Sequence, residues 1–179
     1  GIIENYAALR KMLLEKGYTF SSETDTEVAA KLIDLRYREC GDHLSALSAV
    51  MREMVGSYAM AVLFADAPDR LYALKNAVPL IVGVGEGENF IASDIAAVLR
   101  HTKNYYPLGD LQMAVVTAHS IDIMDIDKRP LHPEMMTADW SVEAAERGGY
   151  PHFMIKEINE EPAAVEKTLH PRIAGMLPD

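Results

Sequence analysis

The sequence has one cysteine, Cys40, among 179 residues, so no internal disulfide can form. Lys and Arg number 17 against 27 Asp and Glu, and no basic stripe is visible. Because neutralising phosphates needs clustered Lys and Arg, this balance argues against a nucleic-acid partner. No apolar run approaches the roughly 20 residues of a membrane span, and no signal peptide is visible. These absences indicate a globular, cytoplasmic protein.

Metal ligands and a self-contained catalytic group are also missing from the sequence. Asp122–Asp127 resembles a calcium loop only superficially, because Arg129 stands where a third oxygen ligand should follow and the glycine of the loop is absent. Nothing resembles a serine nucleophile elbow. We expect no metal and no cofactor, and we expect Cys40 to be a structural thiol near the end of a helix. Histidines occur without metal-ligand spacing at positions 43, 101, 119, 132, 152 and 170.

The first third of the chain has the hydrophobic period of helices. One helix is predicted from Glu4 to Lys16, where Gly17 ends it. A second is predicted to run up to Cys40 and Gly41. Asp42 can cap a third helix, which Gly56 closes.

From Ser57 the pattern changes to short apolar runs typical of strands. A short helix is predicted from Asp94 to Arg100, and residues 131–150 look irregular. Helices followed by a meander of strands point to an α+β layered sandwich. The predicted strands are Tyr58–Phe64, Leu71–Lys75, Pro79–Val84, Asn89–Ser93, Tyr105–Leu108, Gln112–Ala118 and Ser120–Ile126.

The C-terminal part predicts two helices, Phe153–Glu160 and Pro162–Leu169, because Pro suits the first turn of a helix. Three breakers of periodicity follow, at Pro171, Gly175 and Pro178. We therefore expect residues 171–179 to begin a linker to a further domain.

Two short motifs have both a structural and a functional interpretation. Thr24-Asp25-Thr26-Glu27 fits a capping box, in which Thr24 caps a helix and Glu27 bonds back to the amide of the cap. Asp25 in the first turn gains from the helix dipole, yet its carboxylate can also hold an ammonium group. Gly83, Gly85 and Gly87 suggest a nucleotide loop, but the spacing and the adjacent acids favour a hairpin turn.

Several segments resemble the amidotransferase domain of glutamine:fructose-6-phosphate aminotransferases, in order and with similar spacing. The block before the last helices is the most specific to this family, whereas the first two blocks recur loosely in other N-terminal-nucleophile amidotransferases. The matching segments are Gly1–Asn5, Gly17–Phe20 with Ser22–Glu27, Pro79–Gly83 with Gly87–Asp94, and Gly148–Ile158.

The resemblance implies a four-layer αββα sandwich of the N-terminal-nucleophile hydrolase type, with residues 1–170 forming part of the glutaminase domain. In the family a cysteine thiolate attacks the side-chain amide of glutamine, and ammonia passes to a sugar-isomerase domain that makes glucosamine 6-phosphate. Gly1 matches the glycine whose backbone N–H serves the oxyanion hole. Asp25 matches the aspartate that binds the α-ammonium of glutamine, with Thr24 and Thr26 supporting it.

The family's cysteine nucleophile and the first strands of the sandwich have no counterpart in the sequence. We therefore predict that this polypeptide alone releases no glutamate from glutamine. An incomplete sandwich would leave an apolar face or an unpaired strand edge, which predicts a homo-oligomer. Two alternatives remain: part of another class II amidotransferase, or a non-catalytic binding or interaction module that kept the fold.

Overall fold

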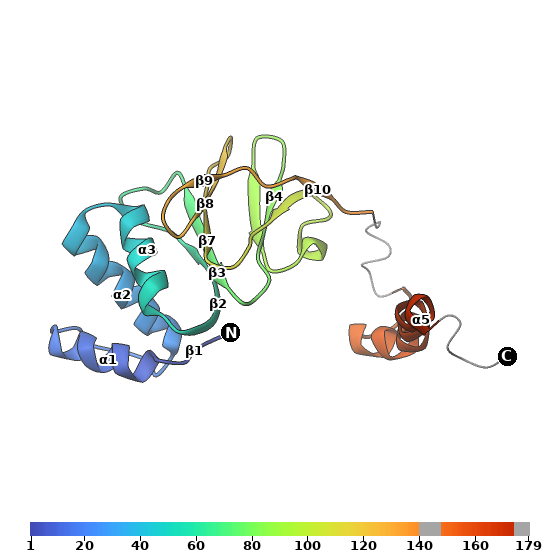
Figure 1. Ribbon diagram of the computed structural model, residues 1–179, viewed down its shortest axis with the longest axis horizontal. Helices are drawn as coiled ribbons and strands as arrows, with labels where there is room; N and C mark the ends of the chain where they lie inside the picture. Colours follow the sequence, from blue (N-terminus) through green and yellow to red (C-terminus); the bar gives the residue numbers. More distant parts are fainter. Residues whose placement is uncertain (140–147, 174–179) are drawn as a thin grey trace. The chain divides into compact units, whose positions relative to one another are not determined.

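The computed structural model describes residues 1–139 and 148–173. The chain divides into two compact units, Gly1–Ala138 and Asp139–Asp179. Unit 1 contains three helices and both sheets (Figure 1). In the described part of unit 2 the regular element is one long helix.

Helix α1 spans Tyr6–Glu15, α2 spans Asp25–Cys40 and α3 spans His43–Glu53. The predicted end of α2 at Gly41 and the predicted cap of α3 at Asp42 are confirmed. The predicted end of α3 is wrong, because the helix stops at Glu53 and Gly56 begins strand β2 (Gly56–Val62). Gly41 stops α2 in the left-handed region at φ 70°, a conformation that glycine adopts readily. The side chain of Asp42 then accepts the amide of Ser45 at 2.8 Å and caps α3.

Helix α1 begins two residues later than predicted because Ile2 and Ile3 form strand β1. The side chain of Asn5, at the N-cap position, makes no capping bond. Instead, its Nδ2 donates to the carbonyl of Glu53 at 2.8 Å, and its Oδ1 accepts the amide of Val55 at 3.0 Å. Asn5 thus fixes the end of α3 beside the start of α1.

Six strands form the first sheet, in the order β1-β2-β3-β7-β8-β9, and all neighbours are antiparallel. Strands β3 and β7 lie at the centre of the sheet, between β2 and β8, and the edge strands are β1 and β9. Beyond β1, the strands are β2 (Gly56–Val62), β3 (Leu71–Asn76), β7 (Gln112–Val116), β8 (Ile121–Asp125) and β9 (Pro130–Leu131).

The second sheet has four antiparallel strands in the order β10-β6-β4-β5. The predicted hairpin around the glycines is confirmed, since β4 pairs with β5 and the amide of Gly85 donates to the carbonyl of Glu88 at 3.1 Å. The strands are β4 (Ile81–Val84), β5 (Asn89–Ala92), β6 (Asn104–Pro107) and β10 (Met136–Thr137).

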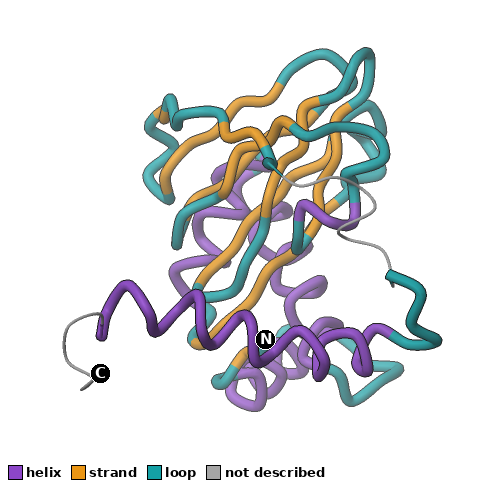
Figure 2. The backbone as a smooth tube through the Cα atoms, turned by 90° about the vertical axis from the view of Figure 1, so that its right-hand side faces the viewer, coloured by secondary structure: helices purple, strands orange, loops and turns teal. Residues whose placement is uncertain are grey.

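Two apolar layers hold unit 1 together. Alternate residues of β3 show the division: Tyr72 and Leu74 join the core that includes the helices, whereas Ala73 joins the core between the sheets. The order is therefore helices, first sheet, second sheet, which confirms an α+β sandwich; Figure 2 views it from 90° away with the strands in orange. Unit 1 has no long helix after α3, so a second helical layer is not part of this unit.

Two predictions about local structure are wrong. The segment Asp94–Arg100 forms only a 3₁₀ turn, η1 (Ile95–Ala97), which Asp94 caps by accepting the amide of Ala96 at 2.7 Å. The two C-terminal helices are one continuous helix, α5 (Phe153–Ile173). Pro162 removes one backbone donor, but its fixed φ is itself helical, so the helix continues through it.

Residues 171–173 of the predicted linker continue α5, and the remaining residues, 174–179, lie outside the described part of the chain. The expected irregular stretch from 131 to 150 contains the two-residue strand β10 and the end of β9. Among the described helices, none has the length and apolarity needed to cross a lipid bilayer.

Candidate functional site

The N-terminus of α2 meets β1, and this junction brings together the two residues expected to form part of a glutamine site. Oδ2 of Asp25 accepts the backbone amide of Ile3 at 2.9 Å. Gly1 lies two residues before Ile3 and directly precedes strand β1. The half-buried carboxylate of Asp25 therefore contacts strand β1 two residues along the chain from Gly1.

The second carboxylate oxygen of Asp25 is free to bind a ligand. Within the part of the chain that the structure describes, no hydrogen bond or ion pair is made by its Oδ1. Asp25 lies in the first turn of a helix of 16 residues, where the positive end of the helix dipole attracts anionic groups. An ionised carboxylate with one unoccupied oxygen can accept N–H donors from an ammonium group.

Gly1 occupies a place that only glycine fits. A Cβ added to Gly1 would lie 2.0 Å from the carbonyl oxygen of Ser57, which is far inside van der Waals contact. The same crowding occurs across the strand pair, where a Cβ on Gly56 would lie 2.3 Å from the carbonyl oxygen of Ile2. Glycines on both strands thus allow β1 to lie close against β2.

The capping box differs from its prediction in one bond. Thr24 caps α2 as expected, since its Oγ1 accepts the amide of Glu27 at 3.3 Å. Glu27 does not bond back to the amide of Thr24. Its carboxylate accepts instead the amides of Ser21 at 2.9 Å and Ser22 at 2.7 Å, and the hydroxyl of Ser22 at 2.6 Å.

The hydrogen bonds to Glu27 change its titration. The Ser22 hydroxyl, followed by the amide of Ser21, lowers the pKa of Glu27 from 4.5 to about 2. Lys31, one turn along α2, also approaches the carboxylate at 3.2 Å. Glu27 therefore holds the loop before Asp25 against the helix, which fixes the position of the Asp25 side chain relative to β1.

Cys40 does not belong to this junction. It is the last residue of α2, whereas Asp25 is the first, so their Cα atoms lie about 22 Å apart at a rise of roughly 1.5 Å per residue. The predicted position at a helix end is confirmed. The thiol is exposed and donates to the carbonyl of Asp42 at 3.3 Å.

One polar cluster was not predicted from the sequence. Nε2 of His43 bonds Oδ1 of Asp66 at 3.0 Å, and Nδ1 of His43 bonds the hydroxyl of Tyr72 at 3.0 Å. Tyr37 donates to the other oxygen of Asp66. This hydrogen bond lowers the pKa of Asp66 and raises that of Tyr37. The members come from α2, α3, β3 and a loop, so no local sequence pattern joins them.

Other sequence motifs have structural roles. Residues of the superficial calcium loop form β8 and a turn, in which Oδ1 of Asp125 accepts the amides of Asp127 and Arg129 at 2.9 Å each. Among the described residues, no group of three or more His, Cys, Asp or Glu side chains is placed to hold a metal ion.

Comparison with known proteins shows which family this chain is similar to. A family model described as a glutamine amidotransferase domain matches residues 1–100. The glutamine–fructose-6-phosphate aminotransferase (isomerizing) of Caldanaerobacter subterraneus subsp. tengcongensis is 51% identical over 173 residues. The enzyme of the same name from Clostridium perfringens is 50% identical over 173 residues. Each comparison covers 97% of this chain and 28% of the relative, so the chain spans less than a third of the length of these proteins.

A solved structure supports the fold assignment. The glutamine phosphoribosylpyrophosphate amidotransferase of B. subtilis, complexed with ADP and GMP, superposes with a TM-score of 0.57 at 19% identity. The match covers 70% of this chain and 28% of that chain. At this identity the likeness concerns the fold, and it agrees with the sandwich of helices and two sheets in unit 1.

Proposed function

The chain belongs to the glutamine amidotransferase domain family, and on that basis we propose that it forms the glutamine-binding part of the glutaminase domain of a glutamine–fructose-6-phosphate aminotransferase. The observation that carries this proposal is the bond from the Ile3 amide to Asp25. This contact holds one carboxylate oxygen still, two residues along the chain from Gly1, and leaves the other oxygen available to a ligand. The names of the 51% and 50% identical relatives support the choice of enzyme.

In the proposed site Asp25 binds the α-ammonium group of glutamine through Oδ1. A charge-assisted hydrogen bond of this kind favours an amino acid over an analogue that lacks the ammonium. Since Oδ2 is held by a backbone amide, the carboxylate keeps its orientation without a ligand. Thr24 supports this arrangement as the cap of α2, and Thr26 lies on the next position of the same turn.

The amide of Gly1 is proposed to donate to the oxyanion that forms when the side-chain amide of glutamine is attacked. Such a preorganised donor stabilises the transition state, and removing one from an enzyme costs roughly 3–4 kcal/mol. The lack of a side chain at Gly1 lets the backbone approach both β2 and a substrate closely. Cys40 is not the attacking thiol, because it lies at the opposite end of α2 from Asp25.

The remaining parts of the proposal concern the longer protein in which this domain works. Ammonia released from glutamine would be used by a sugar-isomerase domain that converts fructose 6-phosphate to glucosamine 6-phosphate. We propose residues 1–170 as part of the glutaminase domain, residues 171–179 as the start of the connection, and a cytoplasmic location. The expected homo-oligomer stays a prediction.

Titration of the ¹⁵N-labelled chain with L-glutamine, followed by amide NMR, tests the site directly. We expect saturable shifts at the amides of Ile3 and Asp25, and no such shifts with glutaramate, which has the same amide and carboxylate but no α-ammonium. Asp25→Asn keeps an acceptor for Ile3 and should abolish the response. Glu23→Gln, a matched change at an exposed acid two residues away, should leave it intact. Equal responses to the two ligands, or a full response in Asp25→Asn, would refute the proposal.

A further inference from the structure

Asn76 is the last residue of β3, and its side chain makes a bond beyond the end of that strand. The backbone of Asn76 pairs with Tyr58 of β2. Its side-chain Nδ2 donates to the carbonyl of Gly56 at 2.8 Å, two residues back along β2 from that pair. The side chain of Asn76 thus supplies a donor to β2 where the pairing with β3 has ended.

The carbonyl of Gly56 and the amide of Ile3 are held on opposite sides of one residue pair. Ile3 and Gly56 oppose each other directly in the antiparallel pairing of β1 with β2. Opposed residues of such a pair either exchange two hydrogen bonds or exchange none. Because the Ile3 amide donates to Asp25, this pair exchanges none. The Gly56 carbonyl therefore points away from β1, to the donor of Asn76, while the Ile3 amide points away from β2.

The peptide that joins Gly56 to Ser57 lies against β1. Gly56 has φ 114°, a backbone conformation that residues with a side chain rarely adopt. The carbonyl oxygen of Ser57 is the atom that a Cβ on Gly1 would meet first, at 2.0 Å. Ile3 lies opposite Gly56 itself. A bond that fixes the carbonyl of Gly56 therefore fixes the surface of β2 against which β1 lies.

Asn76 is itself held by its two neighbours in the chain. Oδ1 of Asp110 accepts the ammonium group of Lys75 at 2.8 Å and the amide of Ala77 at 2.9 Å. Lys75 is buried, with 8% of its surface exposed. Ala77 has φ 60°, in the left-handed region that residues other than glycine seldom occupy, and such residues cluster at functional sites. Since both neighbours are fixed, the side chain of Asn76 keeps its direction.

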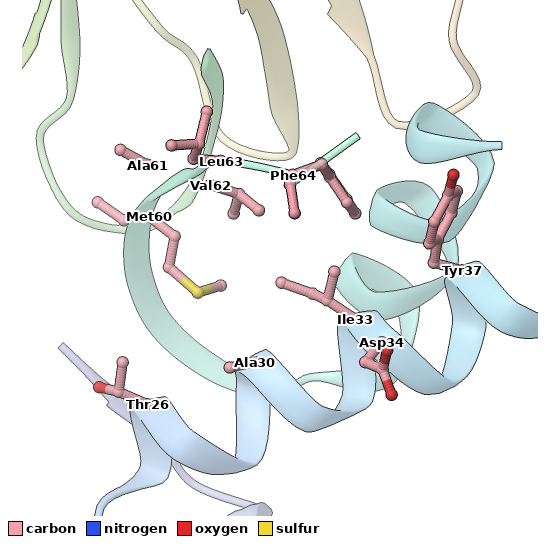
Figure 3. Close-up of a pocket in the computed structure, with 12 residues that line it drawn as sticks. Thr26, Ala30, Ile33, Asp34, Tyr37, Met60, Ala61, Val62, Leu63 and Phe64 are labelled. Atoms are coloured by element: carbon pink, nitrogen blue, oxygen red, sulfur yellow. The ribbon is translucent and has the colours of Figure 1, made fainter. Parts of the chain in front are cut away.

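The rest of β2 is held by other contacts. It pairs with β3 at five positions. In Figure 3 the side chains of Met60 and Val62 and that of Ile33 point into the space between β2 and α2. Met60 and Val62 also pack against the core that includes the helices. Loss of the side-chain bond of Asn76 should therefore loosen the start of β2 and leave its centre in place.

We propose that Asn76 is a positioning residue for the glutamine site: it holds β1 through Gly56, so that the amide of Ile3 meets Asp25. This role rests on the glutamine site proposed above. Asn76 does not bind glutamine in this arrangement. It acts on the affinity because the carboxylate of Asp25 keeps its orientation only while Ile3 stays in place.

The chain offers a matched control in Asn89. Nδ2 of Asn89 also donates to a backbone carbonyl, that of Thr117, at 2.8 Å, and both bonds are part-buried. Thr117 follows the last residue of β7, whereas Lys75, next to Asn76, pairs with Gln112 at the start of β7. The two asparagines thus make the same kind of bond at opposite ends of the strands.

The experiment compares Asn76→Ala with Asn89→Ala in the full chain. Asn89→Ala removes a further bond, from the Gly85 amide, so the control loses at least as much hydrogen bonding. Asn76→Asp, which keeps the shape of the side chain but replaces its donor by an acceptor, is the second test variant. Amide hydrogen exchange is measured without glutamine at Ile3 and at Leu74 in the centre of the first sheet. The dissociation constant for L-glutamine is then measured from the shifts of the Ile3 amide.

We expect both Asn76 variants to speed exchange at Ile3 by about tenfold or more beyond any change at Leu74. Asn89→Ala should not raise exchange at Ile3 beyond its effect at Leu74. The dissociation constant for L-glutamine should rise about tenfold in the Asn76 variants and less than about twofold in Asn89→Ala.

Exchange at Ile3 that rises no more in the two Asn76 variants than in Asn89→Ala would overturn the inference. So would equal dissociation constants for L-glutamine in Asn76→Ala and Asn89→Ala. An unchanged chain that gives no shifts with L-glutamine would refute the proposed function instead, and the exchange at Ile3 would still decide whether Asn76 holds β1.

Discussion

Oδ2 of Asp25 accepts the backbone amide of Ile3 at 2.9 Å, although 22 residues separate them in the sequence. This bond joins the first residue of α2 to a two-residue strand. It orients the carboxylate that we propose as the ligand of the α-ammonium group of glutamine. One oxygen is held by the protein, and the orientation of the other follows from it.

The bond also makes a prediction about stability. Asp25→Ala should lower the free energy of unfolding by about 1–3 kcal/mol, because the part-buried amide of Ile3 loses a charged acceptor. Asp25→Asn should lower it less, since an amide oxygen can still accept. Urea denaturation of the two variants measures the difference. Equal losses in both would mean that the charge, and not the acceptor, stabilises the junction.

Glu27 predicts a pH-dependent contribution to stability. Its pKa falls from 4.5 to about 2 in the folded chain, so the folded state favours the ionised form. The contribution is complete above the ordinary pKa and is lost as the pH falls from about 4.5 toward 2. We expect Glu27→Gln to lower the melting temperature at pH 7, and the gap between the two proteins to narrow steadily below about pH 4.5.

Comparing the two proteins at each pH isolates Glu27 from other carboxylates with lowered pKa values, such as Asp42 and Asp110, which both proteins keep. Melting curves from pH 7 down to the acid transition give the comparison. A gap of constant size across this range would show that the hydrogen bonds from Ser21 and Ser22 act independently of the charge.

Much of the fold was predictable because its signals are local. Gly41 and Asp42 mark the boundary between α2 and α3, and both do so through bonds within four residues. The strand predicted at Leu71–Lys75 is confirmed as β3, and its residues Tyr72, Ala73 and Leu74 divide between the two cores.

The parts that were missed depend on contacts distant in sequence. Asn5 was expected inside a helix, but its side chain bonds Glu53 and Val55, about 50 residues away. Glu27 satisfies the pattern of a capping box, yet it bonds the serines of the preceding loop. The hydrogen bond between Asp25 and the amide of Ile3 was missed for the same reason, because the two residues are 22 positions apart and a helix pattern describes only neighbouring residues.

Close packing of β1 on β2 predicts an unequal effect of two glycine substitutions. Gly56 and Gly87 both have positive φ, 114° and 72°, so Ala is strained at each, by about 1–3 kcal/mol. A Cβ at Gly87 would meet nothing within 4 Å, whereas at Gly56 it would lie 2.3 Å from the carbonyl oxygen of Ile2. Gly56→Ala should therefore cost more stability than Gly87→Ala in urea denaturation. If Gly87→Ala instead lowered the free energy of unfolding more, β1 would be able to move away from β2 at little energetic cost.

The cluster around His43 predicts a modest structural contribution. Tyr72 is 4% exposed, and its hydroxyl meets Nδ1 of His43 at 3.0 Å. Tyr72→Phe removes only this oxygen and should lower the free energy of unfolding by about 1 kcal/mol. Tyr105→Phe, at a half-buried tyrosine of β6, is the matched control and should change stability less. A lower denaturation midpoint for Tyr105→Phe than for Tyr72→Phe would show that the hydrogen bond between Tyr72 and His43 does not stabilise the fold.

The position of Cys40 predicts that thiol chemistry and ligand binding are independent in this chain. The thiol is exposed, so iodoacetamide should modify it fully in the folded protein. Cys40 lies at the far end of α2 from Asp25, about 22 Å away by the helical rise. Alkylation, or Cys40→Ser, should thus leave the glutamine-dependent shifts at Ile3 unchanged, and no glutamate should be released from glutamine by either form. Loss of those shifts on alkylation, or release of glutamate that depends on Cys40, would place the thiol in the site and contradict the separation that α2 imposes.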